Sequence, residues 1–208
     1  MSELIKVLIV DDHESLRNLF EMEFIPENGF EVAASIGNAN DAAAFCAMKN
    51  PELVIMDVCT ENGESGLDAA AKILKSFPDV KVIVTSGFDE ITYSPRAKEL
   101  GAHAFVYKTK GIAYYREVAK RVLDGEYIFP EPKKIPLPQG ETPFTDREME
   151  VLRLLCGHMS TQEVAVTLMI SQKTVHRHME NMVQKAGFKS SMELVVYVLS
   201  SGWINPGY

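Results

Sequence analysis

The chain has 208 residues, 46% of them apolar, and a formal net charge of −8, which is ordinary for a globular protein of one large or two small domains. No run approaches 18 uncharged apolar residues, and the first apolar run begins almost at the N-terminus, so we expect neither a membrane span nor a cleavable signal. Cys46, Cys59 and Cys156 lack metal-ligand spacing, which is typical of reduced thiols in a cytoplasmic protein.

The negative charge is concentrated in the N-terminal part of the chain. Residues 1–130 contain 13 Lys and Arg against 21 Asp and Glu, whereas residues 141–208 contain 6 against 7. Because no block is basic, charge alone does not predict nucleic-acid binding, which would need a specific motif.

The first 128 residues alternate between short apolar runs and stretches with helical patterns. The apolar runs predict strands buried in a sheet, at residues 6–12, 30–36, 53–57, 80–85 and 104–108. The predicted helices are residues 13–24, 41–48 (with Asn40 as a candidate cap), 66–77, 89–100 (a poor helix interrupted by Pro95) and 112–124. Five strands alternating with five helices predict an α/β fold, a doubly wound five-stranded parallel sheet.

Several chemically reactive side chains follow the predicted strands. The third strand is four apolar residues followed by Asp57, which places this acid at the carboxyl edge where open α/β sheets hold their reactive groups. A lone acid there is usually a turn former or a helix cap. However, Asp11 and Asp12 end the first strand, Thr85 the fourth and Lys108 the fifth. All of these side chains are therefore predicted to face one edge.

Together these side chains suit phosphoryl transfer to a carboxylate. Three carboxylates in one crevice repel one another unless a cation joins them, and hard oxygen ligands favour Mg²⁺. Asp57 is predicted to be the nucleophile, with Lys108 and Thr85 holding the phosphoryl oxygens. Phosphatases of the haloacid dehalogenase type also use a strand-end Asp, but they need a second acid two positions later, where this chain has Cys59.

A proline-rich segment follows. Five prolines fall between Pro130 and Pro143 without helical or strand periodicity, which predicts a linker, the alternative being an extension of a single domain. We expect a first domain of residues 1–128, a linker of residues 129–142 and a second domain of residues 143–208.

The second domain is predicted to be a small all-α domain of four helices. Capping boxes begin three of them, at Thr145–Glu148, Ser160–Glu163 and Ser190–Glu193. The remaining helix starts after Ser171 and ends before Gly187.

Two of these helices, residues 162–169 and 172–186, are joined by a short turn and form a helix-turn-helix, whose second helix can enter the major groove of DNA. Residues 175, 179 and 182 are apolar and can face the core. The polar residues of this helix are the candidate DNA contacts: Gln172, Lys173, Thr174, His176, Arg177 and Asn181. A four-helix interaction module with a solvated face is the alternative interpretation.

Residues 4–125 resemble the flavodoxin-like receiver domain of bacterial two-component response regulators. The family's acidic pair, acceptor aspartate, switch threonine and lysine match Asp11, Asp12, Asp57, Thr85 and Lys108. The resemblance implies that a cognate sensor histidine kinase phosphorylates the acceptor in the presence of Mg²⁺. It implies no enzyme with a separate substrate, only phosphotransfer to the chain's own aspartate and slow self-dephosphorylation.

The resemblance also extends the site. The backbone carbonyl of Cys59 would complete the Mg²⁺ site, and Phe105 would move with the switch threonine, although a core aromatic is the other interpretation of this residue. Glu61 stands where the family usually has proline, and the loop before the Ser65–Leu67 signature is one residue longer. These departures concern the switching surface more than the chemistry.

Residues 144–200 resemble the LuxR-type (NarL/FixJ-type) DNA-binding domain. The match lies in Phe144–Leu152, Glu163–Ala165, Ile170–His178 and Glu193–Leu194, and receiver, linker and this domain follow the family's standard order. The resemblance implies a phosphorylation-dependent transcription regulator that binds promoter DNA. It implies a homodimer on DNA or on phosphorylation, with the last helix as the dimer contact, although most of the apolar residues of this helix could equally belong to the core.

This tail is less basic than the family usually is. Val166 and Thr167 stand where paired Arg is common, Met169 where Gly usually makes the turn, and Glu180 where a positive or neutral residue is usual. Since neutralising phosphates drives much of DNA affinity, we expect modest, dimer-dependent binding. Two alternatives stay open: a regulator that acts by protein–protein interaction, with a tail that binds DNA weakly or not at all, and DNA binding independent of phosphorylation, against which the intact acidic set argues.

Overall fold

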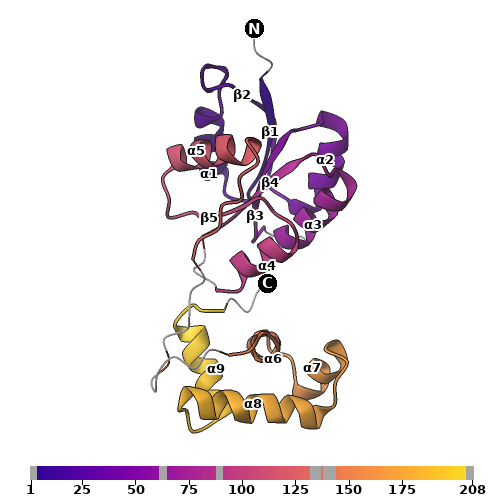
Figure 1. Cartoon of the computed structure of the whole chain (residues 1–208), viewed down its shortest axis with the longest axis vertical. Coiled ribbons are helices and arrows are strands. Elements are labelled where there is room, and N and C mark those ends of the chain that lie inside the picture. Colours follow the sequence, from indigo (N-terminus) through magenta and orange to yellow (C-terminus); the bar gives the residue numbers. More distant parts are fainter. Residues whose placement is uncertain (1–3, 61–64, 88–90, 132–136, 138–143, 205–208) are drawn as a thin grey trace. The chain divides into compact units, whose positions relative to one another are not determined.

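The computed structural model of the chain (Figure 1) describes residues 4–60, 65–87, 91–131, 137 and 144–204. By their internal contacts the residues group into two compact units, one of residues 1–88 and 93–131 and the other of residues 89–92 and 132–208. Most of the predicted linker lies outside the described residues. Among the described helices, none is both long enough and apolar enough to cross a membrane.

The first unit is built on a sheet of five parallel strands. The strands are β1 (Ile5–Val10), β2 (Phe30–Ile36), β3 (Leu53–Asp57), β4 (Lys81–Ser86) and β5 (Ala104–Tyr107). Their order is β2-β1-β3-β4-β5, and each neighbouring pair is parallel. This arrangement confirms the predicted doubly wound fold.

Helices cover both faces of this sheet (Figure 1). Alternate residues of β3 enter two separate cores, Val54 and Met56 on the side of α2, α3 and α4, and Leu53 and Ile55 on the side of α1 and α5. Because both faces of β3 are buried, its sequence is an uninterrupted apolar run. The helices are α1 (Glu14–Glu23), α2 (Ala42–Lys49), α3 (Gly66–Ser76), α4 (Tyr93–Glu99) and α5 (Ile112–Leu123), with short 3₁₀ turns η1 (Pro26–Asn28) and η2 (Ala39–Asp41).

The structure corrects two local predictions. The helix expected from residue 89 begins at Tyr93, and Pro95 lies in its first turn, where its missing N–H removes no helical hydrogen bond. Pro95 therefore does not interrupt the helix. The N-cap position of α2 is held by Asp41, not by the predicted Asn40, because the chain enters α2 through the 3₁₀ turn η2, which Asn38 caps by accepting from the backbone N–H of Asn40.

The second unit contains four helices within its described residues. They are α6 (Asp146–Cys156), α7 (Thr161–Thr167), α8 (Gln172–Ala186) and α9 (Ser191–Ser200). Val151, Val175, Met182 and Val198 are almost completely buried in their common core. An α/β unit followed by a small all-α unit confirms the predicted fold class.

The ends of these helices follow the capping signals of the sequence. Thr145–Glu148 and Ser160–Glu163 form complete capping boxes. The third box is incomplete: Ser190 Oγ accepts from the backbone N–H of Glu193, but the carboxylate of Glu193 accepts from the backbone N–H of Lys189. Each cap satisfies backbone N–H groups that the first helical turn leaves without partners.

Candidate functional site

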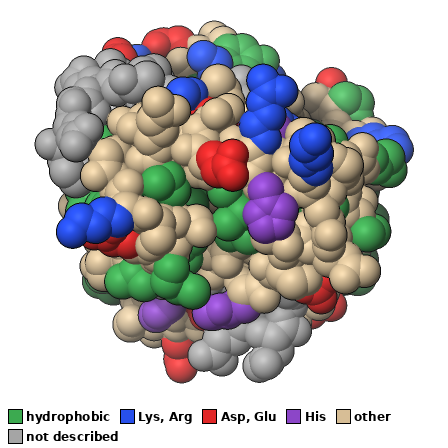
Figure 2. All heavy atoms as spheres, turned by 90° about the horizontal axis from the view of Figure 1, so that it is seen from below, with side chains coloured by type: hydrophobic (Ala, Val, Ile, Leu, Met, Phe, Trp, Pro, Cys, Tyr) green, Lys and Arg blue, Asp and Glu red, His purple; other side chains and the backbone are tan. Residues whose placement is uncertain are grey.

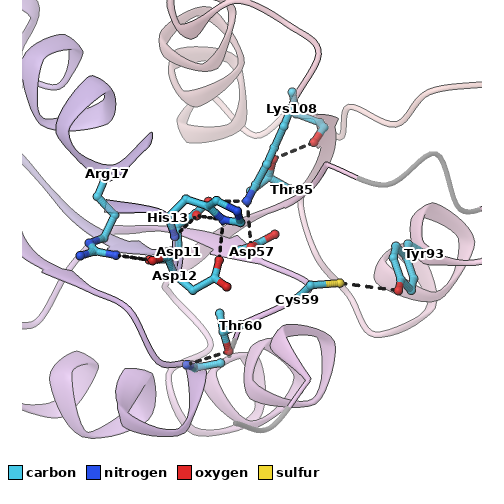
Figure 3. Close-up of polar contacts among 12 residues, drawn as sticks. Asp11, Asp12, His13, Arg17, Asp57, Cys59, Thr60, Thr85, Tyr93 and Lys108 are labelled. Atoms are coloured by element: carbon cyan, nitrogen blue, oxygen red, sulfur yellow. Dashed lines mark hydrogen bonds and ion pairs between the residues drawn. The ribbon is translucent and has the colours of Figure 1, made fainter. Parts of the chain in front are cut away.

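The carboxyl ends of four neighbouring strands bring the predicted reactive side chains together (Figure 3). Asp57 is the last residue of β3 and pairs in register with Thr85 of β4. Asp11 directly follows β1, and Lys108 directly follows β5. Because all four strands run in the same direction, their ends form one edge, at the position where open α/β sheets bind ligands.

Lys108 lies between two carboxylates of this edge. Its Nζ is 2.7 Å from Asp11 Oδ2 and 2.8 Å from Asp57 Oδ2. Burial raises the pKa of Asp57 to about 7, although Lys108 acts in the opposite direction. Burial lowers the pKa of Lys108, but its attraction to Asp57 and its contacts with both carboxylates outweigh burial and leave that pKa above its ordinary value. The ammonium therefore stays charged in the site.

The same edge offers a set of metal ligands. One ligand atom from each of four residues lies within 4.8 Å of the others: Asp11, Asp12, His13 and Asp57. Asp11 Oδ2 and Asp12 Oδ1 are buried carboxylate oxygens without a hydrogen bond of good geometry; their near neighbours are Lys108 Nζ and His13 Nδ1, each at 2.7 Å. Several buried carboxylate oxygens share few donors here, and they retain acceptor capacity that fits a hard divalent cation such as Mg²⁺. His13 was not among the predicted ligands, and only the structure brings it into this set.

Arg17 fixes the backbone that carries the acidic pair. Its Nη1 donates to the carbonyl oxygens of Asp11, at 2.6 Å, and Asp12, at 3.1 Å (Figure 3). Arg17 is the fourth residue of α1, at the end of its first turn. The sequence did not single out this residue, since an Arg on a helix is usually a solvated side chain.

The loop that follows β3 is anchored on two sides (Figure 3). Cys59 is buried, and its Sγ lies 3.7 Å from the hydroxyl of Tyr93 in α4. Thr60 Oγ1 accepts a hydrogen bond from the backbone N–H of Ala39. Metal binding by the carbonyl of Cys59 stays a prediction, and the atypical position Glu61 lies outside the described residues.

Helix α3 begins directly against the end of β3. Ser65 Oγ caps the helix by accepting from the backbone N–H of Leu67, and the N–H of Gly66 donates to the carbonyl of Val58. A β-carbon on Gly66 would lie 1.8 Å from the carbonyl oxygen of Asp57. Only glycine permits this approach, so the helix start helps to place the backbone of Asp57.

The predicted switch residues lie in the core beside the acids. Thr85 is fully buried, and its Oγ1 makes two hydrogen bonds, at 2.9 Å with the carbonyl of Val106 and at 2.5 Å with the hydroxyl of Tyr115 on α5. Phe105 is buried, in edge-on contact with the ring of Tyr107. The role of Phe105 in switching stays a prediction. Tyr115 was not predicted from the sequence to contact Thr85, and the structure adds it to the site.

Helix α8 carries all the candidate DNA contacts. Gln172, Lys173, His176, Arg177 and Asn181 are exposed. Thr174 is half-buried, and its N–H and hydroxyl both contact Ser171 Oγ at the start of the helix. Lys, Arg and His side chains on the face seen in Figure 2 are mixed with acidic and apolar ones. The described residues on this face therefore form no continuous basic patch of the kind found on a strongly charged DNA-binding surface.

The turn between α7 and α8 contains a methionine with positive φ, at a position where glycine would be favoured. Met169 has a φ of +54°, in the left-handed region that glycine adopts without strain. Its side chain is 93% exposed and therefore gains little packing energy to offset this strain. Arg147 of α6 donates to the carbonyl of Leu168 at 2.7 Å. This bond fixes the end of α7 and the start of the turn.

Comparison with known proteins matches each unit to a family. Residues 7–118 match the response regulator receiver domain, and residues 142–198 match the bacterial regulatory proteins of the luxR family. The oxygen regulatory protein NreC of Staphylococcus aureus is 30% identical to this chain and is aligned over 93% of this chain and 96% of its own length.

Solved structures show the same folds. A LuxR-family DNA-binding response regulator from Staphylococcus aureus is 30% identical, with a TM-score of 0.54 over 58% of this chain and 99% of that chain. RcsB from Salmonella enterica serovar Typhimurium, bound to a promoter in the presence of the phosphomimetic BeF₃⁻, has a TM-score of 0.64 at 18% identity, over 94% of this chain and 98% of that chain.

The first match makes the α/β unit a receiver domain, and the class of protein is therefore the response regulator. With both matches on one chain, and a relative that aligns over nearly its whole length, the chain belongs to the LuxR family of response regulators. Its second unit is a LuxR-type DNA-binding domain, in which α7 and α8 form the helix-turn-helix.

Proposed function

We propose that Asp57 accepts a phosphoryl group from a sensor histidine kinase and that this phosphorylation controls promoter binding by the helical domain. The observation that carries the proposal is the position of Lys108, whose ammonium contacts Asp11 and Asp57 at one edge of the sheet. A buried carboxylate, a fixed ammonium and neighbouring carboxylates that can hold a divalent cation are the parts that phosphoryl transfer to an aspartate requires.

In the proposed reaction an oxygen of Asp57 attacks the phosphorus atom of a phosphohistidine. The bond from phosphorus to the histidine nitrogen breaks, and an acyl phosphate forms on the carboxylate. Asp11, Asp12 and Asp57 would hold Mg²⁺, with the carbonyl of Cys59 as the expected additional ligand. When bound, the ion neutralises charge on the phosphoryl oxygens. Lys108 stabilises the same oxygens with its ammonium.

The chain itself is proposed to act on no separate substrate. It transfers the phosphoryl group to its own aspartate and releases it slowly by hydrolysis. Because promoter DNA is the proposed target, the proposed place of action is the cytoplasm.

Labelling with a small phosphodonor tests the phosphoacceptor. Wild-type chain incubated with acetyl phosphate and Mg²⁺ should gain one phosphoryl group by intact mass, and Asp57→Asn should gain none. Asp79→Asn, which changes an exposed aspartate away from the site, is the matched control and should label like the wild type. Persistent labelling of Asp57→Asn would refute the assignment.

For DNA binding, we propose that α8 reads the major groove and that the phosphorylated chain binds as a homodimer. The RcsB complex with a promoter supports this proposal by analogy of fold. The exposed side chains of Met192 and Val196 on α9 provide an apolar stripe for the dimer contact. Selection of bound sequences from random DNA, with and without phosphodonor, tests it: an enriched two-fold site that requires the phosphodonor is the expected result.

A second candidate function is regulation by protein–protein interaction with a tail that binds DNA weakly. It is favoured by the exposed apolar side chains of the helix-turn-helix, since Val166 is 74% and Met169 93% exposed. If the selection yields no enriched site in either condition, this second function is preferred.

A further inference from the structure

The hydroxyl of Thr85 has a defined hydrogen-bonding arrangement. Its Oγ1 lies 2.9 Å from the carbonyl oxygen of Val106, which can only accept, so Thr85 donates its one proton there. The hydroxyl of Tyr115, at 2.5 Å, must then donate to Thr85. Thr85 is therefore both donor and acceptor.

The position of Tyr115 is itself fixed. This side chain of α5 is 2% exposed, and its ring packs edge-on against Phe20 of α1, with 4.9 Å between ring centroids. Burial raises the pKa of Tyr115, and the negative charges of Asp11 and Asp57 add to that rise. The phenol thus keeps its proton and remains a donor.

Phosphorylation of Asp57 places a new acceptor beside this arrangement, since Thr85 pairs in register with Asp57. For Thr85 to donate to a phosphoryl oxygen, its proton must leave the carbonyl of Val106. If Oγ1 moves as well, the buried hydroxyl of Tyr115 loses its acceptor. A buried polar group without a partner is costly. The arrangement therefore opposes the change that phosphorylation requires.

We propose that Tyr115 is a positioning residue that holds Thr85 in the arrangement of the unphosphorylated receiver, so that its hydroxyl weakens the response of the site to a phosphoryl group. This inference rests on the proposed phosphorylation of Asp57. Removing only the phenolic oxygen, by Tyr115→Phe, keeps the ring packing on Phe20 and leaves Thr85 with a single hydrogen bond to break.

Beryllofluoride binding to the full chain in the presence of Mg²⁺ tests the proposal, because the anion imitates a phosphoryl group without forming an acyl phosphate. By titration calorimetry, Tyr115→Phe should bind about fivefold more tightly than the wild type, the effect of one net hydrogen bond. Tyr114→Phe removes the neighbouring phenol of the same helix, whose ring contacts Lys110, and should bind like the wild type.

The dependence on Thr85 separates positioning from packing. In a Thr85→Ala background, Tyr115→Phe should change the affinity less than twofold; in a Thr85→Ser background, which keeps a hydroxyl, the gain should return. Equal or weaker binding by Tyr115→Phe overturns the proposal, since weaker binding would make the phenol a ligand of the anion. A gain that persists with Thr85→Ala also overturns it.

The same titration separates this inference from the proposed function. If the wild type binds no more tightly than Asp57→Asn, the phosphoacceptor assignment fails, and the role of Tyr115 fails with it. If the wild type binds, Asp57→Asn does not and Tyr115→Phe shows no gain, only the role of Tyr115 is overturned.

Discussion

Lys108 Nζ lies 2.8 Å from Asp57 Oδ2 and joins the ends of β5 and β3 across the receiver site. Even so, burial raises the pKa of Asp57 to about 7, with Asp11 and Asp12 adding to the rise. One ammonium does not compensate for the loss of water around a group of carboxylates. The folded receiver therefore binds a proton at Asp57 more tightly than the unfolded chain does.

Asp57→Asn should consequently stabilise the metal-free chain at neutral and higher pH. Because the folded pKa lies above the ordinary value of 3.8, the stability linked to protonated Asp57 is fully present below that value. It is lost as the pH rises through about 7. Urea unfolding in the presence of a chelator should show Asp57→Asn more stable than the wild type by about 1–3 kcal/mol near pH 8, with a smaller difference near pH 5.

Two further conditions sharpen this measurement. Adding Mg²⁺ near pH 8 should narrow the difference, since a cation at the carboxylates favours ionised Asp57. The exposed Asp79 provides the control, and Asp79→Asn should follow the wild type at every pH. A difference between Asp57→Asn and the wild type that does not vary with pH would contradict the raised pKa of Asp57.

Gly66→Ala should damage the proposed phosphorylation site more than the fold as a whole. The added β-carbon would meet the carbonyl oxygen of Asp57 at 1.8 Å and its carbonyl carbon at 2.8 Å, and neither backbone atom can turn aside as a side chain could. We expect a loss of about 1–3 kcal/mol of stability, together with labelling by acetyl phosphate that is slower by at least roughly tenfold. Gly111→Ala, where a β-carbon meets no atom within 4 Å, is the control. Wild-type labelling of Gly66→Ala would show that the acceptor tolerates a shifted α3.

Much of this site could be predicted from the sequence because it depends on topology. Buried parallel strands are continuous apolar runs, so the residues after those runs could be assigned to one edge before any contact was known. Asp11, Asp57 and Lys108 are brought together in this way. The helix caps were equally local signals, since each spans only four residues.

The remaining features depend on distances that no local pattern contains. Tyr115 is an aromatic residue on the core face of α5, and its spacing is the same whether or not its hydroxyl contacts Thr85. The approach of Gly66 to Asp57 arises only when α3 docks on β3. Pro95 was misjudged because its effect depends on the helical turn that it occupies, and helix starts are poorly determined by composition.

Met169→Gly should stabilise the DNA-binding domain. Met169 has a φ of +54°, a conformation that disfavours residues with a β-carbon, and its side chain is 93% exposed, so little packing is lost with it. The relief of left-handed strain should exceed the greater chain entropy of glycine and give a net gain of about 0.5–1 kcal/mol. Unfolding followed by the fluorescence of Trp203, the single tryptophan of the chain, reports on this domain. Met169→Ala keeps the β-carbon and should give no gain; an equal gain would assign the effect to the exposed thioether instead.

Val166→Arg should strengthen DNA binding without changing sequence preference. Val166 is 74% exposed on α7, the first helix of the helix-turn-helix, and the exposed cations of the following helix include Lys173 and Arg177. An added Arg that neutralises one more phosphate should steepen the slope of log affinity against log salt by about 1. Filter binding of the full chain across a salt series measures this slope, and the wild-type slope should be shallower than about −8.

A control must show whether the slope changes because of the added positive charge itself or because of its position on the helix-turn-helix. Met22→Arg adds the same charge at a side chain that is 73% exposed on α1 of the receiver. Since salt leaves a Debye length of only about 8–10 Å, a charge on the receiver that touches no phosphate should leave the slope unchanged. Equal slopes for Val166→Arg and Met22→Arg would show that the position of the added charge does not affect the salt dependence. A wild-type slope of about −8 or steeper would show that the tail already makes the phosphate contacts of a strongly basic DNA-binding domain.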